Sequence, residues 1–91
     1  MYYVYVLFSH KDKKLYVGYT TDFDERLKRH FSGNVTATQN RLRLEHIYHE
    51  CYQSSAEAKR REKYLKGGNG REQLKIQLSE TLQRLGYLFR Y

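Results

Sequence analysis

The sequence lacks the features that stabilise secreted proteins or anchor membrane proteins. It has a single cysteine, Cys51, among 91 residues, so no intramolecular disulfide framework supports the fold. A lone thiol fits a reducing compartment. No positively charged leader and no long apolar segment precede the aromatic stretch that begins at Tyr2. We therefore expect a cytoplasmic protein without a membrane partner.

Acidic residues are also few: the sequence has ten acidic and seventeen basic residues, which gives a formal net charge of +7. Such an excess on a short chain favours a polyanionic partner, with nucleic acid first, although solubility alone can also explain basic charge. No basic helix shows a broad apolar face, which argues against an anionic membrane. The length predicts one domain with a single modest core, and a monomer is favoured.

Two runs of aromatic and β-branched residues predict a β-hairpin over residues 2–8 and 15–20, joined by a polar loop. With an even-numbered loop, odd-numbered side chains of the first strand share a face with even-numbered ones of the second. The residues on that face are then Tyr3, Tyr5, Tyr16 and Gly18. Gly18 removes bulk where two tyrosines converge, which predicts the floor of a pocket.

The next element is a predicted helix over residues 22–32. Asp22 and Glu25 match a capping box, and the expected buried stripe repeats every four residues: Phe23, Leu27 and Phe31. Arg26 and His30 lie one turn apart beside this stripe, so both side chains can reach the sheet.

A polar loop over residues 35–40, closed by Arg41, leads to a third predicted strand over residues 44–52. The loop is rich in hydroxyls and amides, which suit phosphate oxygens, but an ordinary connection explains it equally well. The strand contains His46 and His49. Strict alternation places them on opposite faces, which argues against a zinc site.

A second capping box predicts a helix over residues 54–66, whose apolar side is thin and contains Glu62. A carboxylate in a buried stripe is costly unless it is paired or bound to a cation. Glu62 is therefore either a metal ligand or the partner of a nearby basic side chain. The candidate partners are Arg26, Arg61 and Lys66.

The glycine-rich segment 67–70 predicts a tight turn between helices, and Asn69 with Glu72 is expected to cap a third helix. The apolar residues of that helix are Leu74, Ile76 and Leu78. Residues 79–91 should add a short helix and a tail on the same domain, which itself spans residues 1–78.

These elements predict an α/β fold of the α+β type. Its small three-stranded antiparallel sheet is flanked by helices in the order β-β-α-β-α-α.

The order of the motifs resembles the GIY-YIG nuclease superfamily, especially its small stand-alone bacterial members. The resemblance rests on Tyr3-Val4-Tyr5, then Leu15-Tyr16-Val17-Gly18-Tyr19-Thr20-Thr21-Asp22, then Glu25-Arg26-Leu27-Lys28-Arg29-His30. Tyr3 stands where the first signature triplet has glycine, and Val17 replaces isoleucine in the second. The likeness extends to about Leu78, and the combination is far more specific than either triplet alone.

The resemblance implies a similar fold, cleavage of nucleic acid and a metal-binding glutamate at Glu62. By the same resemblance, the other functional positions correspond to Tyr5, Tyr16, Arg26 and His30. Phosphodiester hydrolysis needs an activated water, a cation and donors that hold the phosphate.

We hypothesise that Glu62 holds one divalent cation, most simply Mg²⁺, and that Arg26 stabilises the developing charge. Tyr5 or Tyr16 takes the proton of the attacking water, assisted by His30. A free tyrosine has a pKa of about 10, and the surrounding cations are expected to lower it.

Other basic residues are expected to contact the nucleic-acid backbone, and they are Lys14, Arg29, Arg41, Arg61, Lys66 and Arg71. The sequence thus predicts a metal-dependent DNA endonuclease that recognises shape, as in repair or recombination. The alternatives are a non-cleaving binding module of the same fold and an RNA-directed protein.

Overall fold

Strand β1 (Tyr2–Ser9) is the centre of the molecule, because every layer packs against it. It lies between β2 (Leu15–Thr20) and β3 (Leu44–Tyr52) and runs antiparallel to both, in the order β2-β1-β3. The computed structural model describes residues 1–89. β1 is buried continuously from Val4 to Ser9, as expected for a strand covered on both faces.

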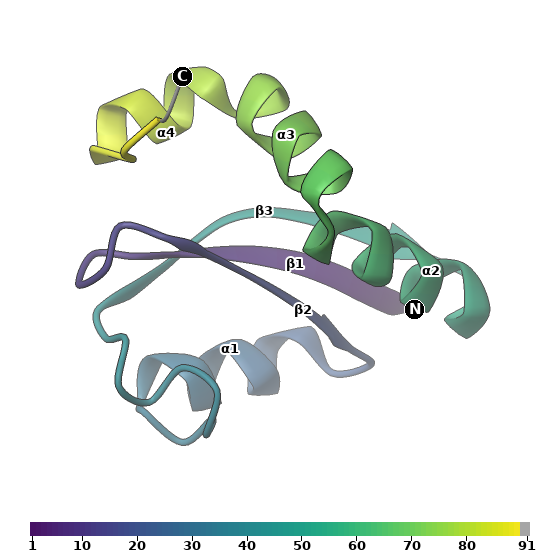
Figure 1. The fold of residues 1–91 in the computed structure, drawn as a ribbon. Coiled ribbons are helices and arrows are strands. Elements are labelled where there is room, and N and C mark those ends of the chain that lie inside the picture. Colours follow the sequence, from purple (N-terminus) through teal and green to yellow (C-terminus); the bar gives the residue numbers. More distant parts are fainter. Residues whose placement is uncertain (90–91) are drawn as a thin grey trace.

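The helices cover the two faces of the sheet unequally (Figure 1). Helix α1 (Phe23–Phe31) lies on one face, and α2 (Ser55–Lys66), α3 (Gly68–Gln77) and α4 (Ser79–Leu85) lie on the other. This arrangement confirms the predicted α+β fold and its element order, with the expected short extra helix at the end. Within residues 1–89, no helix is long and apolar enough to span a bilayer.

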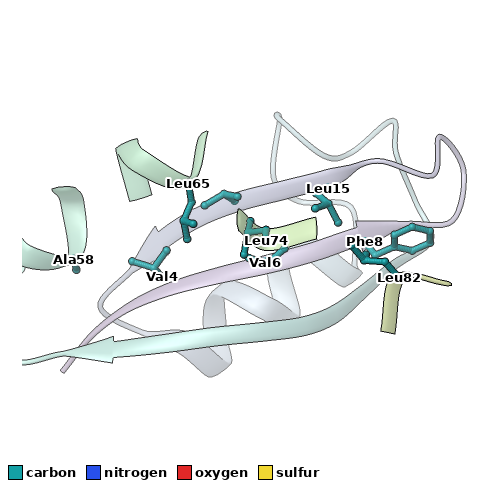
Figure 2. Close-up of a cluster of buried hydrophobic side chains, with 9 residues drawn as sticks. Val4, Val6, Phe8, Leu15, Ala58, Leu65, Leu74 and Leu82 are labelled. Carbon is teal, nitrogen blue, oxygen red and sulfur yellow. The ribbon is translucent and has the colours of Figure 1, made fainter. Parts of the chain in front are cut away.

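The core divides between the two faces because side chains alternate along β1. Even-numbered β1 residues join the larger cluster under α2, α3 and α4, drawn in Figure 2. This cluster comprises Val4, Val6, Phe8, Leu15, Val17, Ala58, Leu65, Leu74 and Leu82. Burying one large aliphatic or aromatic side chain contributes about 1.5–3 kcal/mol, so the three helices are held mainly by this layer.

Odd-numbered β1 residues face α1 and form the smaller cluster. Tyr5, Leu7 and Leu44 are buried there, with Tyr16, Phe23 and Leu27 packed against them. The register pairs Tyr5 with Gly18 and Leu7 with Tyr16, so the predicted odd-to-even match across the hairpin is confirmed. Tyr3 also points to this face, where its ring stacks on Phe23 at a centroid distance of 5.0 Å.

The buried side of α1 differs from the prediction. Asp22 caps the helix as expected, since its carboxylate accepts a hydrogen bond from the Glu25 amide at 3.4 Å. Phe31, expected in the buried stripe, is 46% exposed, whereas His30 is fully buried. The reason is that the last turn of α1 directs His30 toward polar partners that fully satisfy its ring.

The start of α3 also differs from the prediction. α2 ends at Lys66 and α3 begins at Gly68, so Gly67 caps α3 without any side-chain hydrogen bond and Asn69 lies in the first turn. The tight turn itself is confirmed. Ile76 is 77% exposed because only the side of α3 that carries Leu74 meets the sheet.

A bulge in β3 overturns the prediction that His46 and His49 lie on opposite faces. Val6 pairs with Tyr48 but Leu7 pairs with His46, so Ile47 is an extra residue in the ladder. His46 Nε2 and His49 Nδ1 lie 3.1 Å apart, and both rings contact Phe23. In the described part of the chain, no group of three or more metal-ligating side chains forms around them or elsewhere.

The C-terminal segment packs on the same core as the rest of the chain. Leu82 of α4 is fully buried in the larger cluster, and Tyr87 and Phe89 pack against that cluster. The division at residue 78 stays a prediction. Residues 90 and 91 of the expected tail lie outside the described residues.

Glycine 70 sets how closely α2 and α3 approach, and this generates a stability prediction. A Cβ on Gly70 would lie 2.0 Å from the Tyr64 carbonyl oxygen and 2.6 Å from Leu65 Cα. These are backbone atoms that cannot rotate away. We expect Gly70→Ala to lower the free energy of unfolding by about 1–3 kcal/mol or more, measured by urea denaturation.

The matched control is Gly68→Ala, because a Cβ there meets nothing within 4 Å. It should be neutral or stabilise the protein by up to about 1 kcal/mol, since alanine is the better helix former. Equal losses in both variants would contradict the close-packing explanation for Gly70.

Candidate active site

A buried tyrosine at the centre of β1 organises the face under α1. The Tyr5 side chain is fully buried, and its hydroxyl lies 2.7 Å from His30 Nε2. Arg26 Nε donates to the same hydroxyl oxygen at 3.4 Å. A Cβ on Gly18 would lie 2.3 Å from the Tyr5 Cζ and hydroxyl oxygen, so the phenol occupies the space that a side chain at residue 18 would fill.

The hydrogen bonds of this cluster form a chain in which each residue donates to the next, from Arg26 through Tyr5 and His30 to Thr38. Arg26 can only donate, so we infer that the Tyr5 hydroxyl donates to His30 Nε2, because no other described residue offers this buried O–H an acceptor. The ring proton of the neutral imidazole then resides on Nδ1, which donates to Thr38 Oγ1 at 2.8 Å. Thr38 is fully buried as well, so the chain from Arg26 to Thr38 leaves no unsatisfied polar atom inside residues 1–89.

His30 is neutral near physiological pH. Burial, followed by the positive charges of Arg26 and Arg29, lowers the pKa of His30 to about 4. The imidazole therefore acts as an uncharged acceptor for Tyr5, because protonation would place a third positive charge beside two guanidinium groups.

Tyr5 differs from the expectation that nearby cations lower its pKa. Burial raises the pKa of Tyr5 to about 12, and the hydrogen bond from Arg26 offsets only part of that effect. At pH 7 only about one Tyr5 phenol in 10⁵ is ionised. The physical reason is that removing the phenol from water disfavours phenolate more than a single guanidinium favours it.

Arg26 lies between the two tyrosines predicted for the site. The hydrogen bond to Tyr5 raises the pKa of Arg26, and the Tyr16 oxygen acts in the same direction. Tyr16 is only partly buried, and its ring centroid lies 6.3 Å from that of Tyr5 and 5.1 Å from that of His30. The structure thus brings together Tyr5, Tyr16, Arg26 and His30.

Glu62 comes from the opposite face of the sheet. Its side chain is 22% exposed, and its carboxylate pairs with Lys66 Nζ at 3.1 Å, which identifies Lys66 among the predicted partners. Its charge also adds a small upward effect on the pKa of Tyr5, after the larger effects of burial and Tyr16. Because β2 is an edge strand, a group from α2 can approach the Tyr5 side of the sheet past β2.

The single carboxylate of Glu62 fits a Mg²⁺ site but not a zinc site. Mg²⁺ is commonly held by one or two carboxylates, with water and substrate phosphate as its other ligands. A partly exposed single carboxylate meets that requirement. A structural zinc site needs four protein ligands and a catalytic one three, and no such group exists within residues 1–89.

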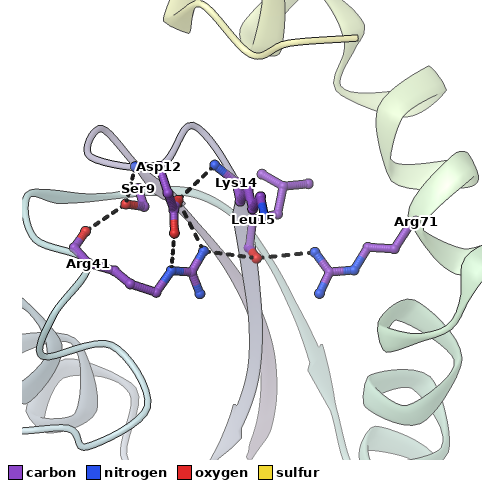
Figure 3. Close-up of polar contacts among 6 residues, drawn as sticks. All are labelled: Ser9, Asp12, Lys14, Leu15, Arg41 and Arg71. Atoms are coloured by element: carbon purple, nitrogen blue, oxygen red, sulfur yellow. Dashed lines mark hydrogen bonds and ion pairs between the residues drawn. The ribbon is translucent and has the colours of Figure 1, made fainter. Parts of the chain in front are cut away.

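Three of the four arginines predicted to contact nucleic acid are engaged inside the protein, as Figure 3 shows for two of them. Arg41 Nε pairs with Asp12 at 2.7 Å, and both Arg41 and Arg71 donate to the Leu15 carbonyl, at 3.4 and 3.2 Å. Burial acts to raise the pKa of Asp12, but the hydrogen bonds from Arg41 and the Lys14 amide outweigh it and lower that pKa. These arginines therefore hold the hairpin to the loop and to α3.

Arg61 is similarly occupied. Its guanidinium pairs with Glu50 through both carboxylate oxygens, with contacts of 3.0 to 3.3 Å. Tyr48 and Tyr52 each donate to the same carboxylate at 2.6 Å. The ion pair of Arg61 with Glu50 thus joins α2 to β3. In contrast, the predicted contacts that remain exposed are Lys14, Arg29 and Lys66.

Thr38 is the residue that sequence reasoning missed. The loop around it was recognised as rich in hydroxyls, but one threonine among several carries no signal of its own. Only the path of the chain after α1 brings its Oγ1 to His30.

The neutral His30 predicts a pH dependence of stability. Its pKa is about 4 in the folded protein and about 6.5 in an unfolded chain, so protonation favours unfolding. The stabilisation is complete above about pH 6.5 and is lost as the pH falls toward 4. Relative to His30→Gln, the wild type should lose about 3 kcal/mol of unfolding free energy over that range in urea denaturation.

Two readouts check the explanation. Parallel losses of stability in wild type and His30→Gln would contradict it. Ring ¹⁵N chemical shifts at neutral pH should also show that His30 is uncharged with its proton on Nδ1. An imidazolium signal would contradict the explanation.

Comparisons with known proteins show the family of this chain. A family model described as the GIY-YIG catalytic domain matches residues 1–75. A UPF0213 protein of Clostridium perfringens is 32% identical over 88 residues, covering 96% of this chain and 94% of that protein. A UPF0213 protein of Staphylococcus haemolyticus is 36% identical over 76 residues, covering 82% and 92% of the two chains.

A solved structure is similar as well. The solution NMR structure of a UPF0213 protein from Bacillus halodurans shares 38% identity with a TM-score of 0.52, and the match covers 81% of this chain and 82% of that one. The matched family domain contains all the candidate residues, from Tyr5 to Glu62. The chain therefore belongs to the GIY-YIG family of nuclease-type catalytic domains.

Proposed function

We propose that this protein is a metal-dependent endonuclease that hydrolyses phosphodiester bonds in DNA. The observation that carries the proposal is the grouping of Arg26 and Tyr16 around the buried Tyr5–His30 pair, with the partly exposed carboxylate of Glu62 on α2 as the candidate metal ligand. In this proposal Arg26 stabilises charge on the phosphate, a phenol accepts the proton of the attacking water, and Glu62 holds a cation, which are roles that phosphodiester hydrolysis uses.

Arg26 is the group that we assign to charge stabilisation. Its Nε is fixed by Tyr5, whose orientation is fixed in turn by His30 and Thr38. The remaining guanidinium N–H groups are then available to a phosphate without reorganisation. Fixed donors aimed at the developing negative charge are commonly the largest contribution to such catalysis.

Tyr16 is the tyrosine that we assign to accepting a proton from the attacking water. Tyr5 is unsuited, because it is fully buried and its pKa is about 12. Tyr16 is partly exposed on the edge strand and lies beside Arg26, so it can meet substrate and water. Tyr5 then acts as a positioning residue for Arg26.

Glu62 would hold the divalent cation, and Mg²⁺ is the simplest choice for a site with one protein carboxylate. The cation would supply Lewis-acid stabilisation of charge on the phosphate. Lys66 pairs with Glu62 at 3.1 Å and is half exposed, so it can move to a phosphate when the carboxylate changes partner.

The proposed substrate is DNA recognised by shape, as in repair or recombination. The domain is small, and its exposed basic side chains suit phosphates more than base edges. We also propose that the protein acts in the cytoplasm as a monomer, consistent with its single exposed cysteine. A non-cleaving DNA- or RNA-binding module is the alternative function.

The first test is cleavage of supercoiled, single-stranded and branched DNA with Mg²⁺ or with chelator. We expect Mg²⁺-dependent cutting that falls about 10²-fold or more in Glu62→Ala and in Arg26→Ala. Glu80→Gln, which changes an exposed carboxylate on α4, is the matched control and should cut normally. Binding without cutting by the wild type would favour the non-cleaving alternative.

The second test separates the two tyrosines. Tyr16→Phe should reduce kcat about 10²- to 10⁴-fold, because the proton acceptor is lost. Tyr5→Phe keeps the buried ring and should have the smaller effect, through weaker positioning of Arg26. Single-turnover cleavage measures both, and a larger loss in Tyr5→Phe would reverse the assignment.

A further inference from the structure

The solvent face of α2 carries two adjoining hollows, which we call the α2 groove. One, of about 480 Å³, is lined by residues that include Tyr52 and Arg61, and the other, of about 550 Å³, by residues that include Lys63 and Gly67. Arg60 and Tyr64 line both. The groove therefore extends along α2 to the turn before α3.

Two basic side chains of the groove, Arg60 and Lys63, have no ion-pair or hydrogen-bond partner among residues 1–89. Arg61 is held by Glu50 and Lys66 by Glu62, but no ion pair or hydrogen bond among residues 1–89 engages Arg60 or Lys63. These two are neighbours three residues apart on the helix, where like charges repel each other and weaken the helix. Because no side chain among the described residues neutralises either charge, both are available to an anionic ligand.

Tyr64 supplies an aromatic surface between the charges. The side chain is 41% exposed, an unusual position for a large aromatic residue, and its hydroxyl donates to Gln73 at 3.2 Å. The Arg61 guanidinium lies 5.4 Å from the ring centroid, on the side of the first hollow. Arg61 does not line the second hollow, whereas Tyr64 lines both, so the exposed part of the Tyr64 ring is a candidate stacking surface.

Helical spacing relates the groove to Glu62, although Glu62 itself does not line either hollow. Glu62 pairs with Lys66, and Lys66 lies one turn from Lys63, which in turn neighbours Arg60. Cations at helical neighbour positions thus lead around α2 from the proposed metal ligand to the exposed tyrosine. A phosphate at Glu62 would have the next phosphates of its strand directed along this row.

We infer that the α2 groove binds single-stranded nucleic acid, with a base stacked on Tyr64 and phosphates on Arg60 and Lys63. An open aromatic ring flanked by cations suits an unpaired strand, because bases stacked inside a duplex cannot reach a side chain. The inference rests on the proposed function, since the bound strand is the continuation of the strand at Glu62.

The test measures binding of a fluorescein-labelled single-stranded DNA by anisotropy, with chelator present so that no cutting occurs. Arg60→Glu/Lys63→Glu should weaken binding about tenfold or more and reduce the salt slope by about 1.4, as for two lost phosphate contacts. Lys11→Glu/Lys28→Glu, at exposed sites away from the groove, makes the same change in net charge and should have a much smaller effect.

The aromatic contact has its own control. Tyr64→Leu should weaken binding about 5- to 100-fold, whereas Tyr64→Phe, which keeps the ring, should bind like the wild type. On an abasic strand with the same number of phosphates, Tyr64→Leu and wild type should bind equally. Unfolding midpoints of all variants show that the comparison is between folded proteins.

The outcomes separate this surface from the nuclease. If the groove variants bind single strands as tightly as the wild type does and the wild type cuts DNA, the inferred binding role of the groove is contradicted and the proposed nuclease function is supported. If the groove variants lose single-strand binding but the wild type cuts no DNA, the inferred binding surface is supported and the proposed nuclease function is contradicted. An RNA strand of the same sequence, tested in parallel, shows which nucleic acid binds more tightly.

Discussion

The hydrogen bond between Tyr5 and His30 is the interaction on which the α1 side of the molecule depends. It joins β1 to α1 across 25 residues of sequence at 2.7 Å, with both side chains fully buried. A buried polar pair is tolerated only when every donor and acceptor is satisfied, and Arg26 and Thr38 complete it at its two ends. Gly18 leaves the space that the phenol occupies.

This burial divides the candidate site into a neutral interior and a charged rim. Inside, the pKa of His30 falls to about 4 and that of Tyr5 rises to about 12, so neither carries charge near neutrality. At the rim, Arg26, Tyr16 and Glu62 retain contact with solvent. The interior supplies rigid orientation, and the rim supplies the groups that can meet a phosphate.

The proposed site takes residues from both faces of the sheet, with the edge strand β2 between them. α1 contributes Arg26 and His30 from one face, and α2 contributes Glu62 from the other. Arg41 and Arg71 bind the Leu15 carbonyl at the same strand, which connects the loop after α1 with α3. Basic residues used in this way stabilise the edge, whereas Arg60 and Lys63 of the α2 groove have no ion pair among the described residues.

By itself, the sequence determined the strands, the helices, the hairpin register and the grouping of Tyr5, Tyr16, Arg26 and His30, because these follow from local periodicity and capping. It also indicated that Glu62 needs a partner, but not which one.

The tertiary structure alone decided the rest. The bulge at Ile47 joined His46 and His49, the last turn of α1 buried His30 in place of Phe31, and the loop delivered Thr38. The tertiary structure also decided which basic side chains form ion pairs within the protein, such as Arg41 with Asp12 and Arg61 with Glu50. Apart from the local pair of Lys66 with Glu62, these outcomes depend on contacts between segments distant in sequence, and no local pattern encodes the desolvation that raises the pKa of Tyr5.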